Sequence, residues 1–550
     1  MREISTFFIL FLCSYINSFS QAVYYNYKLL DVNNIFLLQN NLGSLENRIS
    51  SGAYWNFTEK EDSVPYLWST IVYDQGLWVI GKVDNDVELA YVKWITNFSP
   101  GPIINGQPAL QTNPEDSTEF RVYKVNKSDD ESNIDYAEWP SDLGAPTNKE
   151  NKPLISGDQM LWTVYNSLDT NYIRRYSNVK NISLRTTKQL PIEVHEKIYA
   201  RKGYVKDSID IFSNVVFFEW EIINKGDKRI DSAFIGFWTD IDFCDALANL
   251  PGVDVNRRLG YCWSSSDNCY NPGTAPIAVG YILLYGPVKE SSGNKAIFKG
   301  KEINEFENLP ISSFFGILDD AAFSPLVGNP STLIEAWNAA KGLQLDGNLF
   351  INPITNQPTK FPFNGDPVSD TGWIFPYKET GGGAGFLMFS GPLNLMPADT
   401  QWMMIALVPA AGKNRFESIE LMRKKADELR SLPYDSLAFG TNWLALTSVN
   451  QNEIIPAEFK LYQNYPNPFN PSTTIKYSIP TGGTSLMKSL QLKIYDILGR
   501  EVATLVNEKQ NPGIHHYTFS ILNYKLSSGV YFYQLRAGNF IETKKMILLK

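Results

Sequence analysis

The stretch Val215-Val216-Phe217-Phe218-Glu219-Trp220-Glu221-Ile222 is the densest strand signal in the chain. β-Branched and aromatic residues dominate it, and such side chains pack well on a pleated surface. It ends at the turn residues Asn224-Lys225-Gly226-Asp227, and the apolar run Ser232–Trp238 follows. Upstream, Ile192–Ala200 alternates apolar and polar residues over part of its length. Three such strands with short connections predict an antiparallel meander in a β-sandwich.

The rest of the chain favours a mainly β fold class, with a sandwich-rich body and few helices. Aromatic residues make up 13% of the chain, and 37 Gly and 31 Pro supply turns for many short strands. Further strands are predicted at 70–73, 77–80, 87–92 and 120–125. Helical periodicity predicts two helices, at Ser331–Gly342 and Arg415–Ser431.

Length and composition divide the 550 residues into three parts. Residues 1–20 have the pattern of a secretory signal peptide, because an apolar core follows Arg2, and Ser18 and Ser20 precede a cleavage position. Residues 21–450 are predicted to form a β-rich cargo region of one or two subdomains, and residues 457–550 a separate C-terminal module. No later run reaches the roughly 18 apolar residues of a transmembrane helix, so none is predicted after signal removal.

Charge is divided unevenly between the cargo region and the C-terminal module. The net charge of the chain is −9. From Ala457 onward, 9 Lys and 2 Arg face 4 Glu and 1 Asp, so the cargo region is acidic and the module basic. The basic residues are spread along predicted strands and form no cluster, and an acidic body repels polyanions. No nucleic-acid partner is therefore predicted.

Three cysteines remain after removal of the signal, namely Cys244, Cys262 and Cys269. Secretion places them in an oxidising space, where disulfides persist. Cys262 and Cys269 flank a short polar loop and are the preferred pair, while Cys244 could pair instead. The chain has no CxxC and no Cys/His cluster, which argues against haem, zinc and iron–sulfur sites.

Catalytic motifs are scarce. His195 is the single histidine before the C-terminal module; it lies on a predicted strand, and no GxSxG or HExxH motif occurs. No catalytic or cofactor-binding residue is therefore predicted. Carboxylate pairs stay open, since Glu219 with Glu221, and Asp240 with Asp242, would each share one face of an extended segment. Trp220, Trp238 and Trp263 could stack on sugar rings beside them.

Acidic residues also gather where a predicted strand passes into a less regular stretch. Asp240, Asp242 and Asp245 lie close together there. Calcium binds where several oxygen ligands converge in a loop, but the spacing and glycine of an EF-hand are missing. The three aspartates are a candidate calcium site that would brace the loop; a solvated acidic loop is the alternative.

The C-terminal module carries an ordered series of motifs. It opens on Tyr465-Pro466-Asn467-Pro468-Phe469-Asn470-Pro471. Leu498-Gly499-Arg500-Glu501-Val502 and Ser528-Gly529-Val530-Tyr531-Phe532-Tyr533 follow. Strand patterns lie between them, and the chain ends in Met546-Ile547-Leu548-Leu549-Lys550.

This series resembles the C-terminal sorting domain of type IX secretion cargo in Gram-negative bacteria, over residues 461–550. The resemblance implies a small β-sandwich that the outer-membrane translocon recognises. It also implies removal of the domain by a surface peptidase, after which the cargo is released or attached to surface polysaccharide. The body resembles, through short segments, a group of secreted β-rich proteins that carry the same tail. The carrying segments are Gly76–Gly81, Phe98–Ile103, Gly157–Asn166, Phe237–Asp242 and Phe389–Pro392.

Together these patterns predict a secreted or outer-membrane-surface protein that travels through the periplasm and leaves by the type IX route. Export is indicated by several motifs and catalysis by none, so the body is interpreted as a binding or structural module. The alternative is a carbohydrate-binding or glycoside-hydrolysing protein that uses the aromatic and acidic residues.

Overall fold

The computed structural model describes most of the chain. The described residues are 26–45, 52–55, 69–93, 96–109, 120–168, 190–202, 211–244, 248–267, 276–318, 326–376, 383–439, 459–464, 467–469, 472–480, 490–508, 513–521, 526–538 and 540–549. The chain divides into two compact units, Met1–Thr441 and Asn442–Lys550. Each has its own hydrophobic core. The predicted signal peptide lies outside the described residues.

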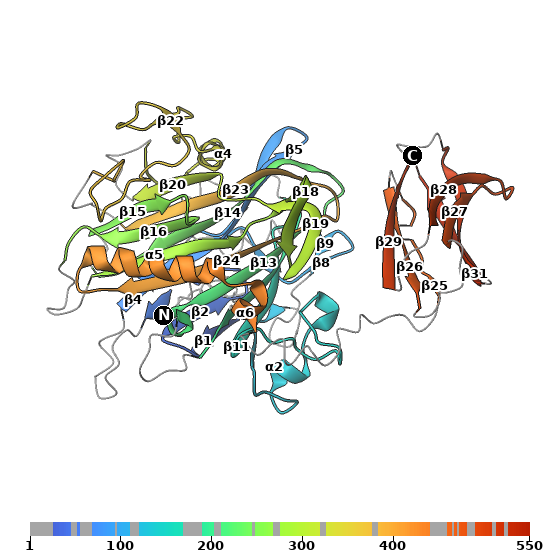
Figure 1. Ribbon diagram of the computed structural model, residues 1–550, viewed down its shortest axis with the longest axis horizontal. Helices are drawn as coiled ribbons and strands as arrows, with labels where there is room; N and C mark the ends of the chain where they lie inside the picture. Colours follow the sequence, from blue (N-terminus) through green and yellow to red (C-terminus); the bar gives the residue numbers. More distant parts are fainter. Residues whose placement is uncertain are drawn as a thin grey trace, which may run out of the picture. The chain divides into compact units, whose positions relative to one another are not determined.

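A nine-stranded sheet is the largest element of the first unit (Figure 1). Its order is β10-β11-β12-β13-β24-β17-β16-β15, with β7 paired to β11. Its strands are β7 (Ser99–Pro100), β10 (Tyr123–Asn126), β11 (Gln159–Asn166), β12 (Ile192–Ala200), β13 (Val216–Asn224), β15 (Asn249–Asp254), β16 (Leu259–Ser264), β17 (Ile277–Tyr285) and β24 (Thr400–Ala411).

A five-stranded sheet, of order β20-β23-β14-β5-β6, packs against one face of the nine-stranded sheet. Its strands are β5 (Asp74–Val83), β6 (Asp86–Tyr91), β14 (Ile230–Ile241), β20 (Ser313–Leu318) and β23 (Ala384–Leu395). Aromatic rings join the two sheets: Phe237 of β14 lies 4.5 Å from Tyr281 of β17 and 5.9 Å from Trp220 of β13, between ring centroids. The mainly β, sandwich-like prediction is confirmed.

The predicted meander is wrong at its third strand. β12 and β13 pair as expected, with Ile198 opposite Phe218. The other edge of β13 is taken by β24, so after the turn the chain crosses to the opposite sheet and forms β14 there. Trp220 and Phe237 therefore face each other across the core instead of lying on adjacent strands.

Smaller sheets and hairpins complete the first unit. A four-stranded sheet contains β1 (Tyr27–Leu30), β2 (Ile35–Asn40), β3 (Ala53–Trp55) and β4 (Ser69–Val72). The two-stranded pairs are β8 (Ile103–Ile104) with β9 (Gln107–Pro108), β18 (Val288–Phe298) with β19 (Lys301–Asn308), and β21 (Phe350–Ile351) with β22 (Pro358–Thr359).

Helices are few and short, apart from α5 (Arg415–Ser431), which has the predicted bounds. The Asn414 side chain caps α5, and its buried stripe of Ile419, Met422, Ala426 and Leu429 lies over β24, β17 and β16 (Figure 1). A capping box of Thr332 and Glu335 begins α4 (Leu333–Lys341), inside the predicted range. The remaining helices in the described part of the chain are α2 (Ile134–Ala137), α6 (Tyr434–Ala438) and the 3₁₀ turns Ser141–Leu143 and Ile211–Asn214. No helix among the described residues is long and apolar enough to cross a membrane.

The second unit contains two antiparallel sheets. One has the order β25-β26-β29, with β25 (Lys460–Leu461), β26 (Ser472–Ile479) and β29 (Gly513–Ser520). The other has the order β28-β27-β30-β31, with β27 (Leu490–Tyr495), β28 (Glu501–Glu508), β30 (Gly529–Ala537) and β31 (Phe540–Leu548). Ile475, Leu492, Tyr533 and Met546 from both sheets are fully buried in one core.

Candidate functional site

The opening motif of the C-terminal module holds the end of the chain in place. Asn467 Oδ1 accepts a hydrogen bond from the Ile547 N–H at 2.8 Å. Phe469 bonds Ile547 and Leu549 through its backbone, and its ring is buried against Phe519 at 6.0 Å between centroids. Pro468 follows Asn467 through a cis peptide. Tyr465 and Pro466 lie outside the described residues.

The other predicted motif residues lie at turns or on a strand of the module. Gly499, with φ +77, occupies the β27–β28 turn, and Gly529, with φ +157, begins β30. Both positions are costly for a residue with a Cβ. Tyr531 of β30 donates a hydrogen bond from its hydroxyl to the Ser527 carbonyl at 2.9 Å. The motif residues are therefore mostly structural parts of the module.

The predicted calcium ligands are only partly described. Asp240 lies at the end of β14, Asp242 follows it, and both are half-buried. Asp245 lies outside the described residues. Within the described ranges, no three His, Cys, Asp or Glu side chains are placed to share a metal ion. The calcium site stays a prediction.

The cysteines differ from the preferred pairing. Cys262 of β16 is a free, buried thiol, so the predicted Cys262–Cys269 bridge is wrong. Its side chain belongs to the apolar core, where burial raises the pKa of the thiol well above its usual value. Cys244 is disulfide-bonded, as the alternative allowed. Cys269 lies outside the described residues.

The two carboxylates Glu219 and Glu221 share the face of the nine-stranded sheet that points away from the five-stranded sheet. The register sets Lys197 opposite Glu219, and His195 opposite Glu221, while Glu193 lies two residues before His195 on β12. These five residues are termed the outer-face cluster. Sequence alternation predicted the Glu219/Glu221 pair, but the partners on β12 depend on strand register.

One half of the outer-face cluster is a closed ion pair. Lys197 Nζ lies 2.9 Å from Glu219 Oε2. Trp402 Nε1 and the Tyr434 hydroxyl also donate to Glu219, at 3.1 Å each. Because only 4% of Glu219 is exposed and donors surround its carboxylate, its role is structural.

The other half joins His195 to three charged side chains. His195 Nε2 lies 3.0 Å from Glu193 Oε1, and Lys225 Nζ lies 3.0 Å from the same oxygen. Burial raises the pKa of Glu193, but His195, the Ile103 N–H and Lys225 outweigh it and hold the pKa below its usual value. Glu221 pairs with Lys299 at the tip of the β18–β19 hairpin. His195 is thus enclosed, and a Cβ added to Gly144 would lie 2.7 Å from its ring.

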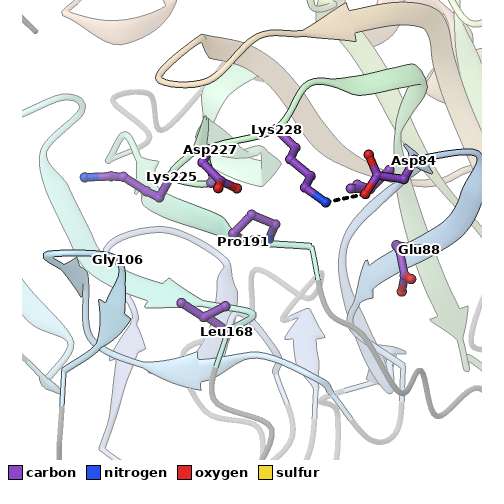
Figure 2. A pocket seen from close by; sticks show the side chains of 10 residues that line it. Asp84, Glu88, Gly106, Leu168, Pro191, Lys225, Asp227 and Lys228 are labelled. Carbon is purple, nitrogen blue, oxygen red and sulfur yellow. Dashed lines mark hydrogen bonds and ion pairs between the residues drawn. The ribbon is translucent and has the colours of Figure 1, made fainter. Parts of the chain in front are cut away.

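A pocket of about 540 Å³ opens at one end of the sandwich, beside the outer-face cluster (Figure 2). It lies between the β13–β14 turn, the β5–β6 hairpin and the β8–β9 turn; we call it the turn pocket. Its lining is Val83, Asp84, Glu88, Gly106, Leu168, Pro191, Lys225, Gly226, Asp227 and Lys228.

Charges of both signs meet at the turn pocket. Lys228 reaches across to an ion pair with Asp84, while Lys225 extends in the opposite direction, towards Glu193 (Figure 2). Glu88 is a buried carboxylate in the wall, and Asp227 is exposed between the two lysines. Val83, Leu168 and Pro191 supply aliphatic surface. The sequence patterns did not indicate these residues, because the site exists only where separate turns converge.

The tryptophans proposed as sugar platforms are core residues. Trp220, Trp238 and Trp263 are 0%, 1% and 7% exposed. Trp220 donates from Nε1 to Glu196 on the inner face of β12 at 2.8 Å. None of the three can stack on a ligand in solution, so this basis for carbohydrate recognition is wrong.

Residues 463–549 match the family model of the secretion system C-terminal sorting domain. The match confirms the predicted sorting module. This sorting tail indicates secretion by the type IX system, to the cell surface or outside. No curated protein matches the chain in sequence.

Solved structures give only remote likenesses. A polysaccharide lyase matches at 7% identity and a TM-score of 0.22, covering 96% of this chain and 47% of the lyase. The adhesin domain of Epf from Streptococcus pyogenes matches at 7% identity and a TM-score of 0.13. This match covers 62% of this chain and 81% of the adhesin domain. Dimeric latent PorU from Porphyromonas gingivalis matches at 12% identity and a TM-score of 0.14. This match covers 71% of this chain and 31% of PorU. This chain thus spans about half of the length of the lyase.

Proposed function

We propose that this protein is a binding or structural module displayed at the outer-membrane surface by the type IX translocon. The sorting module at 463–549 is the observation that carries the proposal. It forms a compact unit of its own, so a surface peptidase can remove it without opening the core of the cargo. A signal peptide at 1–20 would take the chain into the periplasm first. Attachment to surface polysaccharide after cleavage stays a prediction.

Cell fractionation tests the export step. In a type IX-competent host, the full chain should reach the surface or medium, and a chain lacking 461–550 should accumulate in the periplasm. As a matched gain-of-function test, residues 461–550 fused to a periplasmic passenger should carry it outside. Surface delivery of the truncated chain would contradict the proposal.

The body is assigned to binding rather than catalysis because the carboxylates of its outer-face cluster are held in ion pairs. Glu219 is saturated by donors, and Glu193 and His195 are enclosed with Lys225. The turn pocket has a volume of about 540 Å³, within the usual 300–1,000 Å³ range of small-molecule sites. Its mixed carboxylates and ammonium groups over aliphatic walls suit a ligand rich in hydroxyl groups. A saccharide is therefore the ligand class that the pocket favours.

A glycan-array screen of the purified full chain tests the saccharide assignment. Any bound glycan should lose affinity about tenfold on Glu88→Gln or Asp227→Asn, because each change removes a charged hydrogen-bond acceptor from the turn pocket. Glu420→Gln, on the exposed side of α5, is the matched control and should bind normally. An array without bound glycans, or an equal loss of affinity in the control variant, would contradict the saccharide assignment. The proposal of a structural module would then remain.

A further inference from the structure

The β27–β28 turn of the sorting module presents two apolar side chains to solvent. Ile497 is 70% exposed and Leu498 is 72% exposed. Among the exposed large hydrophobic residues of the described ranges, they are the only two adjacent in sequence. Isolated apolar side chains on a surface need no explanation. Ile497 and Leu498 differ from them because they are neighbours in one turn.

Asp496 makes this turn rigid. Its Oδ1 accepts hydrogen bonds from the backbone N–H groups of Leu498 at 2.9 Å and Arg500 at 3.0 Å. Its Oδ2 lies 2.7 Å from Arg500 Nε. Two backbone bonds between Asp496 and the residues Gly499 and Arg500 close the same loop. Gly499, with φ +77, supplies the left-handed residue that the turn requires.

A fixed apolar projection is suited to docking. An anchor that is already in its bound conformation loses little conformational entropy when a partner captures it. Anchors of this kind carry most of the affinity in many interfaces when they fill an apolar recess. Arg500 forms an ion pair with Asp496 within the turn, so residues 496–500 carry no net charge.

We propose that Ile497 and Leu498 are the anchor by which the sorting module docks into an uncharged apolar recess of the type IX translocon. This inference rests on the proposed export function, because the family match supplies the partner. The turn lies within the matched residues, and its side chains make little contribution to the core of the module. A recess lined by aliphatic or aromatic side chains fits this anchor, whereas a charged surface does not.

The test compares variants of the full chain in a type IX-competent host. The Ile497→Ser/Leu498→Ser double variant should lower the ratio of surface to periplasmic protein about tenfold. The matched control is Ile541→Ser, which removes another exposed apolar side chain, at 54% exposure, from the same module. It should be exported like the natural chain. Asp496→Ala keeps both anchors but loosens the turn, and it should give an intermediate loss.

Two further measurements separate the outcomes. Limited proteolysis of each purified full chain checks that the sorting module stays folded, as expected for changes at exposed positions. Normal export of the Ile497→Ser/Leu498→Ser chain, while deletion of 461–550 still blocks export, overturns the anchor and leaves the export function intact. Normal export of the chain that lacks residues 461–550 overturns the export function itself. If the Ile497→Ser/Leu498→Ser variant changes its oligomeric state in sedimentation but is exported normally, the turn serves self-association. This outcome also overturns the proposal.

Discussion

Glu196 is a buried acid on the inner face of the nine-stranded sheet. It accepts hydrogen bonds from Gln39 Nε2 and Trp220 Nε1, both at 2.8 Å and both from neutral groups. Burial raises the pKa of Glu196 to about 8 despite these donors. The folded protein therefore binds this proton more tightly than the unfolded chain does.

The stability of the body should consequently fall as pH rises. The contribution of protonated Glu196 is fully present below the unfolded pKa near 4.5 and is lost as pH rises through about 8. Urea unfolding of the body at pH 5 and pH 8.5 should show this fall, and Glu196→Gln should flatten it. Glu420→Gln, exposed on α5, should leave the slope unchanged. If the stability of Glu196→Gln fell with pH as steeply as that of the natural chain, other groups would set the pH dependence.

Lys197 should be a large contributor to stability, because it is the cation beside buried Glu219. Its side chain is 13% exposed, and that of Glu219 is 5% exposed. Lys197→Met leaves a buried carboxylate without its counter-charge and should cost about 3–5 kcal/mol of unfolding free energy. Adding Glu219→Gln should recover part of this loss. Lys299→Met, at the more exposed pair with Glu221, should cost less than about 1 kcal/mol in the same denaturation assay.

The short helix α6 completes the cover of the outer-face cluster. Ala438 O accepts a hydrogen bond from the Gly157 N–H, and Arg201 Nη1 donates to Ser436 O at 3.3 Å. The Tyr434 ring packs on Trp402 at 5.8 Å and on Tyr285 at 6.4 Å between centroids. This helix therefore belongs to the cargo fold, although it is the described element nearest to the sorting module along the chain.

A cargo chain that ends at Phe439 should melt at the same temperature as the cargo unit of the full protein. A chain that ends at Leu432 loses α6 and should melt several degrees lower, with a loss of about 2 kcal/mol or more from the buried ring and hydroxyl. Tyr434→Phe keeps the ring but removes the donor to Glu219, and should give a smaller loss. Equal melting of the two truncated chains would show that α6 is dispensable.

Individual strands and helices were predictable because the spacing of apolar side chains along a single segment indicates each of them. Ile192–Ala200 is observed as β12 and Arg415–Ser431 as α5, both with the predicted bounds. The path of β14 was not predictable, since the competition of β24 for the edge of β13 arises between segments distant in sequence. The candidate sites were also only partly predictable, because they too depend on segments that are distant in sequence. Alternation placed Glu219 beside Glu221, but the turn pocket joins Asp84 to Lys228, which no local pattern connects.

At the scale of the whole molecule, cargo and sorting module are two folding units. The cargo core and the module core share no residues, and the chain divides between Thr441 and Asn442. This separation suits a module that the secretion system recognises independently of the cargo fold. It also means that mutations in one unit should not destabilise the other.

Calorimetry of the full chain should therefore resolve two unfolding transitions. Leu407 and Leu492 are both fully buried, the first in the cargo core and the second in the module core. Leu407→Ala should shift only the cargo transition and Leu492→Ala only the module transition, each by a loss of about 2–5 kcal/mol for the cavity left behind. The same substitution in the two cores makes each variant the control for the other. A shift of both transitions by either variant would show that the units are coupled, and would contradict independent removal of the sorting module.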